Sequence, residues 1–234
     1  MNDLSQALAA ATHLVVSADA NLLVIVSRSL QVSFAAVLIA AAIGLPAGAI
    51  LAITRIPGRQ AVVALLNALM GLPPVVVGLL VYLLLSRAGP LGELGLLFTP
   101  TAMIIAQAVL ITPIVAALSR QVIEDAWREY EEQLRSLGAG TMAAAITLLW
   151  DTRFALATVV LAGFGRAAAE VGAVMIVGGN IDGVTRVMTT AIALETSKGD
   201  LPLALALGIV LVAIILSVNL LAHWVKLIAQ RHYG

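Results

Sequence analysis

Two charged side chains stand deep within an apolar stretch and are the first candidates for chemistry. Arg166 and Glu170 lie four residues apart in AGFGRAAAEVGA, so a helix would place them on one face. A charge inside a bilayer costs about 2.5–3.5 kcal/mol on insertion scales and normally faces protein or water in a pair. Two interpretations stay open: an ion pair that pins helices together, or an arginine that helps an anion across while the carboxylate restrains it.

The sequence contains no catalytic or metal-binding pattern that we recognise. His13, His223 and His232 are scattered, cysteine is absent, and neither HExxH nor GxSxG occurs. Because no Gly-Lys-Ser/Thr phosphate loop follows a strand, we do not expect the chain to hydrolyse ATP alone. We therefore expect a non-enzymatic chain without a cofactor or metal of its own.

The composition indicates a membrane protein. Of the 234 residues, 61% are hydrophobic and 11% charged, and the mean hydropathy is +1.05. Only a polytopic α-helical membrane protein fits these values. The net charge of zero suggests no nucleic-acid partner. No basic residue precedes Arg28, so we expect no cleavable signal peptide.

The apolar runs predict five membrane-spanning helices in one all-α transmembrane domain covering residues 29–225. The spans are expected at 29–53, 61–86, 100–119, 154–178 and 201–225, with a cytoplasmic loop at 120–153 and a cytoplasmic tail at 226–234. Charges in residues 1–28 leave no uninterrupted run of the roughly 18 residues that a span needs. We expect this segment to be an exterior or interfacial lead-in, with a sixth span as the alternative.

The second predicted span is interrupted near its middle by GLPPVVVG. Two adjacent prolines remove amide donors and clash with the preceding turn, so the helix must kink or unwind there. In lipid, the freed carbonyls must be covered by protein or line a water-filled cavity. This predicts either a gate or a kink buried against a neighbour. The candidate gate and pathway residues are Gly71, Pro73, Pro74, Val75, Val76 and Gln107, the last being also a candidate for an interhelical hydrogen bond.

The longest charged stretch, residues 124–140, holds five of the thirteen acidic residues and is expected to lie in water. Four apolar residues recur along it at steps of 3, 4 and 3, which places them on one helix face. These residues are Trp127, Tyr130, Leu134 and Leu137. We predict an amphipathic helix that links two spans; a helix resting in the headgroup layer is the alternative.

Two further features support a helix over this stretch and mark its end. Glu124 with Arg128, and Glu131 with Arg135, are acid-first i,i+4 pairs, each worth about 0.2–0.5 kcal/mol. Gly138 tolerates the left-handed conformation in which helices commonly end.

Lysine and arginine predict the orientation. Eight of the thirteen basic residues lie in loops on the side of residues 124–140, four lie on the opposite side, and Arg166 lies within a span. The excess marks the cytoplasmic side. Five spans then place the N-terminus outside and the C-terminus in the cytoplasm.

Glu132, followed six residues later by Gly138, resembles the cytoplasmic EAA loop of ABC importer permeases, which docks in a groove of the ATP-hydrolysing subunit. The sequence departs from that loop at Gln133 and Leu134, where alanines are usual, and at Trp150 and Asp151, in place of a closing Leu-Pro. The resemblance implies that the coupling residues are Glu131, Glu132, Arg135, Leu137, Gly138, Ala139 and Gly140.

Longer strings carry a more specific resemblance. Residues 71–92, 98–107 and 163–200 are similar to the tungstate-type permease of ABC importers, and related molybdate permeases are similar around PPVVVG and LGAG. The resemblance implies a type I importer in the cell inner membrane. Two copies of the chain would form the pore, two partner subunits would bind ATP and Mg, and an extracytoplasmic protein would deliver the oxyanion.

The expected function is therefore ATP-driven import of an oxyanion through alternating access, and the resemblance implies that the oxyanion is tungstate. A permease for molybdate or sulfate is the first alternative. A secondary carrier driven by an ion gradient, or a purely structural membrane protein, is the second.

Overall fold

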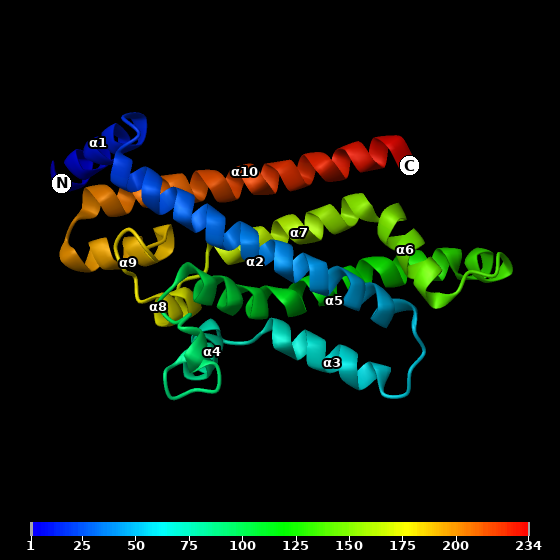
Figure 1. The fold of residues 1–234 in the computed structure, drawn as a ribbon. Coiled ribbons are helices and arrows are strands. Elements are labelled where there is room, and N and C mark those ends of the chain that lie inside the picture. The colour runs from blue at the N-terminus through cyan, green and yellow to red at the C-terminus, as the bar shows by residue number, and fades with distance from the viewer. Residues whose placement is uncertain (1, 234) are drawn as a thin grey trace. The chain divides into compact units, whose positions relative to one another are not determined.

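A computed structural model of the chain describes residues 2–233, with side chains described for residues 5–224. Every regular element in this part of the chain is helical (Figure 1), which confirms the predicted all-α class. The helices are α1 (Asn2–Val16), α2 (Ala20–Ile53), α3 (Arg59–Met70), α4 (Pro74–Leu85), the 3₁₀ helix η1 (Gly92–Leu94), α5 (Pro100–Ser136), α6 (Thr141–Asp151), α7 (Arg153–Ala168), α8 (Gly172–Gly178), α9 (Met188–Lys198) and α10 (Leu201–Tyr233).

Three of these helices are long and apolar enough to cross a membrane alone. They are α2, α5 and the Leu201–Trp224 part of α10. Two pairs, α3 with α4 and α6 with α7, pass the same test when each bent pair is taken as one span, and the bend between α6 and α7 is 76°. Counting both pairs gives five candidate spans, the predicted number. The α6–α7 pair covers residues 141–168 and not the predicted 154–178, and α6 lies within the loop predicted at 120–153.

The chain divides into two compact units. The first comprises residues 1–36, 73–107 and 165–217, and the second comprises residues 37–72, 108–164 and 218–234. The core of the first unit joins α1, α2, α9 and α10 through Ala11, Leu22, Ile25, Met188, Ala191, Ala206 and Leu207. The core of the second joins α2, α5, α6 and α7 through Ala49, Ala52, Ile53, Ile123, Ala144, Ala145, Leu148 and Leu156.

The first long helix begins earlier than the predicted span at 29–53. Helix α2 starts at Ala20 because the Asp19 carboxylate accepts a hydrogen bond from the Leu22 amide at 3.1 Å, as a helix cap does. The preceding segment is itself the helix α1, whose Ala11 is fully buried in the core of the first unit. The lead-in expected at residues 1–28 is thus largely helical.

Small residues allow α2 and α5 to approach closely in the second unit. A side chain at Gly44 would lie 3.0 Å from Val115, and one at Gly48 would lie 2.5 Å from the Ala116 carbonyl. The Ser119 hydroxyl uses this proximity to donate a hydrogen bond to the Gly44 carbonyl at 3.2 Å. The small-residue spacing of Gly44 and Gly48 therefore serves packing.

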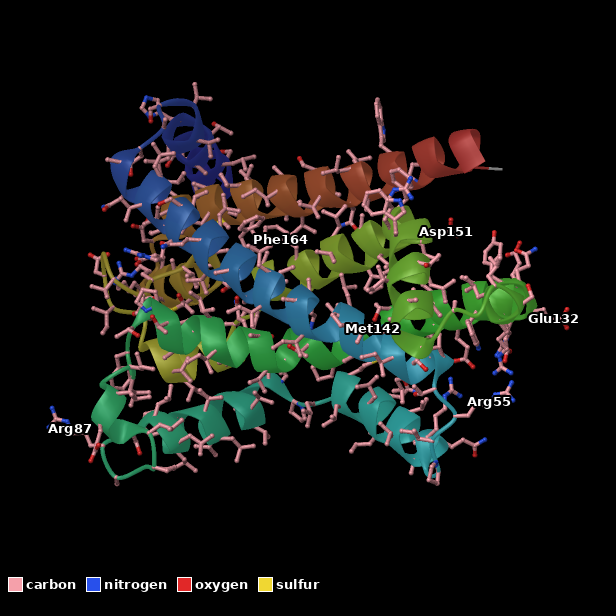
Figure 2. All side chains as sticks on the ribbon, turned by 45° about the vertical axis from the view of Figure 1, so that its right-hand side comes forward. Arg55, Arg87, Glu132, Met142, Asp151 and Phe164 are labelled. Atoms are coloured by element: carbon pink, nitrogen blue, oxygen red, sulfur yellow. The ribbon has the colours of Figure 1, made fainter. Side chains whose placement is uncertain are left out.

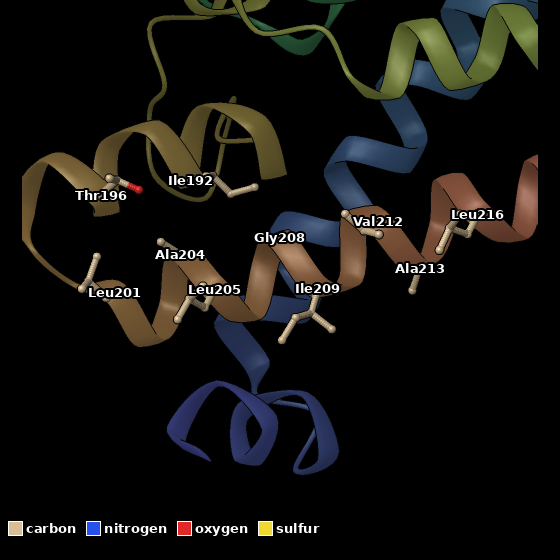
Figure 3. Close-up of a pocket in the computed structure, with 10 residues that line it drawn as sticks. All are labelled: Ile192, Thr196, Leu201, Ala204, Leu205, Gly208, Ile209, Val212, Ala213 and Leu216. Atoms are coloured by element: carbon tan, nitrogen blue, oxygen red, sulfur yellow. The ribbon is translucent and has the colours of Figure 1, made fainter. Parts of the chain in front are cut away.

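An apolar groove of about 710 Å³ lies along α9 and α10 in the first unit (Figure 3). Leu205, Ile209 and Val212 line it, and Thr196 is the polar side chain that α9 contributes. A tetrahedral dianion needs several hydrogen-bond donors or cations. This groove is therefore suited to apolar chains and not to an oxyanion.

Candidate functional site: the coupling arm and the broken helices

The charged stretch continues the third predicted span without a break. Helix α5 runs from Pro100 to Ser136, so the amphipathic segment is the end of a long helix and not a separate one. The i,i+4 pairs predicted along it both form, at 3.3 Å for Glu124 with Arg128 and 2.6 Å for Glu131 with Arg135. We call residues 124–151, the end of α5 together with α6, the coupling arm.

Gly138 ends α5 as predicted. Its φ is +72°, in the left-handed region, and its amide donates to the Arg135 carbonyl at 3.0 Å. The Ala139 amide donates to the Leu134 carbonyl, also at 3.0 Å. These two bonds form a Schellman motif, which satisfies carbonyls at the helix end and turns the chain into α6.

The predicted apolar stripe of the arm divides into buried and exposed parts. Trp127, Tyr130 and Leu134 pack against the core of the second unit, as the helical spacing predicts. Leu137, at the end of α5, is 81% exposed. The stripe therefore anchors the arm and leaves its tip uncovered.

Helix α6 adds an exposed apolar face that the sequence analysis missed. Ala144, Ala145 and Leu148 are buried, whereas three large side chains at i, i+4 and i+8 are exposed. The exposed residues are Met142 (64%), Ile146 (60%) and Trp150 (72%). In Figure 2, α6 runs between the labelled Met142 and Asp151, with Glu132 beyond it at the end of α5. An apolar face beside a charged helix is typical of an interaction surface.

Ion pairs tie the arm to the loop between α2 and α3. Arg55 of that loop pairs with Glu131 at 2.9 Å, and Arg135 pairs with the same carboxylate oxygen. Glu132, the predicted coupling glutamate, is exposed and forms no ion pair among the described residues. Its carboxylate is thus available to a partner.

Glu124 is the centre of a second, less exposed network. Arg59 reaches it at 3.3 Å and also donates to the carbonyls of Leu51 and Ala52 at the end of α2. Arg120 pairs with the same carboxylate, and its side chain is only 12% exposed. One acidic side chain therefore neutralises two shielded arginines.

We expect Glu124→Gln to lower the free energy of unfolding by about 1.5–3 kcal/mol, because it leaves Arg59 and Arg120 without their anion. Arg128 is 72% exposed, so Arg128→Ala should change the stability by less than about 0.5 kcal/mol. Denaturant unfolding of the purified chain in one detergent measures both. Equal losses for the two variants would contradict the central role of Glu124.

The predicted proline break is present. Helix α3 ends at Met70, and α4 begins at Pro74 as its first residue, where a missing amide and a fixed φ are tolerated. Gly71 closes α3 through its amide, which donates to the Ala68 carbonyl at 3.1 Å. Beyond the break, Val75 and Val76 are 57% and 46% exposed. The candidate gate segment thus presents apolar side chains at its surface.

A second break interrupts the predicted span at 154–178, which is not one continuous helix. Helix α7 ends at Ala168 and α8 begins at Gly172. The Glu170 carboxylate accepts a hydrogen bond from the Ala173 amide at 3.2 Å and so caps the first turn of α8. Glu170 therefore lies in the break and not, as predicted, on one helix face with Arg166.

The break gathers buried polar groups within the first unit. Glu170 is 4% exposed and pairs with Arg166 at 2.6 Å, while the Arg166 side chain is 41% exposed. The Thr189 hydroxyl donates to the Glu170 carbonyl at 2.7 Å. The Gln107 amide nitrogen donates to the Ala167 carbonyl at 3.0 Å, which confirms the interhelical hydrogen bond. The Gln107 side-chain oxygen is buried without a partner among the described residues.

The two breaks meet. A side chain at Gly172 would lie 2.8 Å from the Val75 side chain and 3.6 Å from the Glu170 carboxylate. The gate segment and the Arg166–Glu170 pair, predicted separately, are therefore neighbours in the first unit. Their proximity depends on the second break, which no local signal in the sequence predicted.

We expect Arg166→Gln to destabilise the chain more than Glu170→Gln. Arg166→Gln leaves the buried Glu170 carboxylate without its cation and should lower the free energy of unfolding by about 3 kcal/mol. This value is at the lower end of the range for a broken buried ion pair, because Arg166 is partly exposed. Glu170→Gln keeps an acceptor for the Ala173 amide and should lower the free energy of unfolding by about 1 kcal/mol. Unfolding of both variants in the same detergent checks the order, and the reverse order would contradict it.

The structure offers no site for a metal ion among the described residues, since no group of three His, Cys, Asp or Glu side chains comes together there. What it defines is a polytopic α-helical membrane protein. Its second unit carries an exposed, charged and apolar arm. These features are those of a multi-pass membrane protein with an arm exposed at its surface.

Comparison with known proteins identifies the family. The profile of the family described as "Binding-protein-dependent transport system inner membrane component" matches residues 44–231. The chain belongs to this family and is a multi-pass membrane permease. It is 43% identical over 94% of its length to the tungstate uptake system permease protein TupB of Peptoclostridium acidaminophilum, of which 96% is covered.

Two further relatives extend the comparison. The TupB protein of Campylobacter jejuni is 45% identical over 66% of this chain and 64% of its own length. The molybdenum transport system permease protein ModB of Escherichia coli is 30% identical over 88% of this chain and 94% of its own length. The family and its transport role agree with the prediction from the sequence.

Proposed function

We propose that the chain is the membrane subunit of an ATP-driven tungstate importer. The observation that supports tungstate as the substrate is the 43% identity to a tungstate permease over 94% of the chain, compared with 30% identity to a molybdenum permease. Molybdate and sulfate remain the alternative substrates. The chain holds neither ATP nor Mg; separate ATP-binding subunits supply the energy.

The coupling arm supports the proposal that a separate subunit binds ATP. Its tip presents the exposed Glu132 and Leu137 beside the apolar face of α6, which suits docking onto a water-soluble subunit. In our proposal Glu131, Arg135, Gly138, Ala139 and Gly140 hold this tip in shape. The arm lies in the cytoplasm, with the N-terminus outside and the C-terminus inside, in keeping with the distribution of basic residues.

The proposed mechanism is alternating access in a homodimer. ATP binding closes two partner subunits, their docked arms move, and the segments at Gly71, Pro73 and Pro74 open outward to receive the anion from an extracytoplasmic binding protein. Hydrolysis resets the inward-facing state. The partner must bind one state more tightly than the other, since equal binding shifts no equilibrium.

The test is uptake into liposomes that contain the chain and the ATP-binding subunit, with the binding protein added outside. We expect tungstate uptake that requires ATP inside and the binding protein outside. Parallel uptake measurements with molybdate and sulfate identify the substrate. Uptake by the chain alone, driven by an ion gradient, would overturn the proposal in favour of a secondary carrier.

A further inference from the structure

A notch of about 250 Å³ lies on the coupling arm between α5 and α6. Leu134 and Leu148 form its apolar part, Tyr130 contributes a ring, and Asp151 contributes a carboxylate. Leu148 is fully buried by the core, whereas Asp151 is exposed. The notch therefore combines an apolar lining with an accessible acid.

Asp151 lies at the junction of two helices. It is the last residue of α6, and α7 begins two residues later, so the negative end of one helix dipole and the positive end of the next act on its carboxylate in opposite senses. Among the described residues no cation forms an ion pair with it. Arg153, near in sequence, lies over the rings of Trp150 and Phe154 at 5.0 and 4.7 Å. Within the described part of the chain, folding thus gives the Asp151 carboxylate no ion-pair partner.

Other acidic groups strengthen the negative field at the notch. The Glu129 carboxylate, and next the Asp151 carboxylate, raise the pKa of Tyr130 above its usual value. Glu132, also exposed, belongs to the same charged stretch. The notch is therefore complementary to a cation.

We propose that the notch receives an arginine side chain of the ATP-binding subunit. The aliphatic part of the arginine packs on Leu134 and Leu137, which both line the notch, as long basic side chains do on apolar surfaces. Its guanidinium group binds the Asp151 carboxylate in two parallel hydrogen bonds and lies against the Tyr130 ring. Arginine fits better than lysine because its planar group satisfies both contacts. This inference rests on the proposed function, since it names a contact of the docked partner.

The test is the affinity of the ATP-binding subunit for Asp151→Asn in nanodiscs. We expect binding about tenfold to a hundredfold weaker than for the wild-type chain, because a hydrogen-bonded charge is lost. The unfolding temperature of the variant alone should stay unchanged, since the Asp151 carboxylate has no ion-pair partner among the described residues and the dipoles of α6 and α7 act on it in opposite senses. A fall in that temperature would assign Asp151 a structural role and overturn the proposal.

Asp125→Asn is the matched control, because Asp125 lies on α5 with a side chain 79% exposed and does not line the notch. We expect it to bind the ATP-binding subunit within about twofold of wild type. Wild-type binding by Asp151→Asn, or equal weakening by both variants, would overturn the proposal. Failure of the wild-type chain to bind any ATP-binding subunit would instead overturn the proposed function.

A cross-link identifies the occupant directly. The chain contains no cysteine, so a single cysteine at Thr147, which lines the notch, can carry a photoactivatable probe. We expect the probe to label a segment of the ATP-binding subunit that includes an arginine, and Arg→Glu there should restore binding to Asp151→Arg. Labelling of a segment without arginine would overturn the proposal.

Discussion

Gly138→Pro should reduce ATP-driven uptake to less than a tenth of the wild-type rate while the membrane spans stay folded. The φ of Gly138 is +72°, whereas the proline ring requires about −65°. The substitution also removes the amide that donates to the Arg135 carbonyl. The turn from α5 into α6 must therefore rearrange, and the docking face of α6 moves with it. Uptake into proteoliposomes, at matched amounts of inserted chain, measures the loss.

Two alanine substitutions separate backbone strain from the loss of a glycine. Gly138→Ala keeps the amide, but the alanine must adopt the left-handed conformation. This substitution should lower the free energy of unfolding by about 1 kcal/mol. Gly140 has a φ of −71° and open space around it, so Gly140→Ala should reduce uptake much less than Gly138→Pro does. Normal uptake by an assembled Gly138→Pro variant would exclude the arm as the transmitter of force.

The features predicted correctly depend on residues close together in the sequence. Gly138 ends a helix because a residue without a side chain adopts the left-handed conformation easily. Pro73 and Pro74 interrupt a helix because their rings remove donors and clash with the previous turn. Such effects act within one or two turns, so the sequence alone is sufficient to predict them.

The second break and the face of α6 were missed for a different reason. The break at Glu170 follows from a carboxylate that caps α8 and a carbonyl held by Thr189, a contact across nineteen residues. The face of α6 has helical spacing, but in a chain that is 61% hydrophobic an apolar residue does not indicate which side is buried. Only the packing of Leu148 against the core distinguishes the two sides.

The ion pairs of the arm show the same limit. Glu131 with Arg135 was predicted because the two residues share a helix. Arg55 pairs with the same carboxylate across 76 residues of sequence. No spacing rule connects the two positions, since their contact depends on how α2 and α5 pack in the second unit. The assignment of the arm as a coupling element remains a prediction.

Gly78→Ala should impair both stability and uptake, although alanine favours helices. A side chain at Gly78, inside α4, would lie 2.8 Å from the Cα atom and 3.2 Å from the carbonyl oxygen of Ala173 in α8. These are backbone atoms, so the helices themselves must separate. Overpacking of this kind costs about 1–3 kcal/mol. Because α8 follows the break at Glu170, we expect the displacement to disturb the candidate gate as well. Thermal unfolding and uptake of the same preparation measure the two effects.

Gly208→Ala is the control that isolates this contact. Gly208 also lies inside a helix, α10, but no atom lies within 4 Å of a side chain placed there. Alanine should therefore stabilise the chain by about 0.5–1 kcal/mol through helix propensity alone. Opposite signs for the two substitutions would show that Gly78 is required for the approach of α4 to α8. If both variants gained stability, α4 and α8 would not be in contact in the folded chain, and the junction of the two breaks would lose its basis.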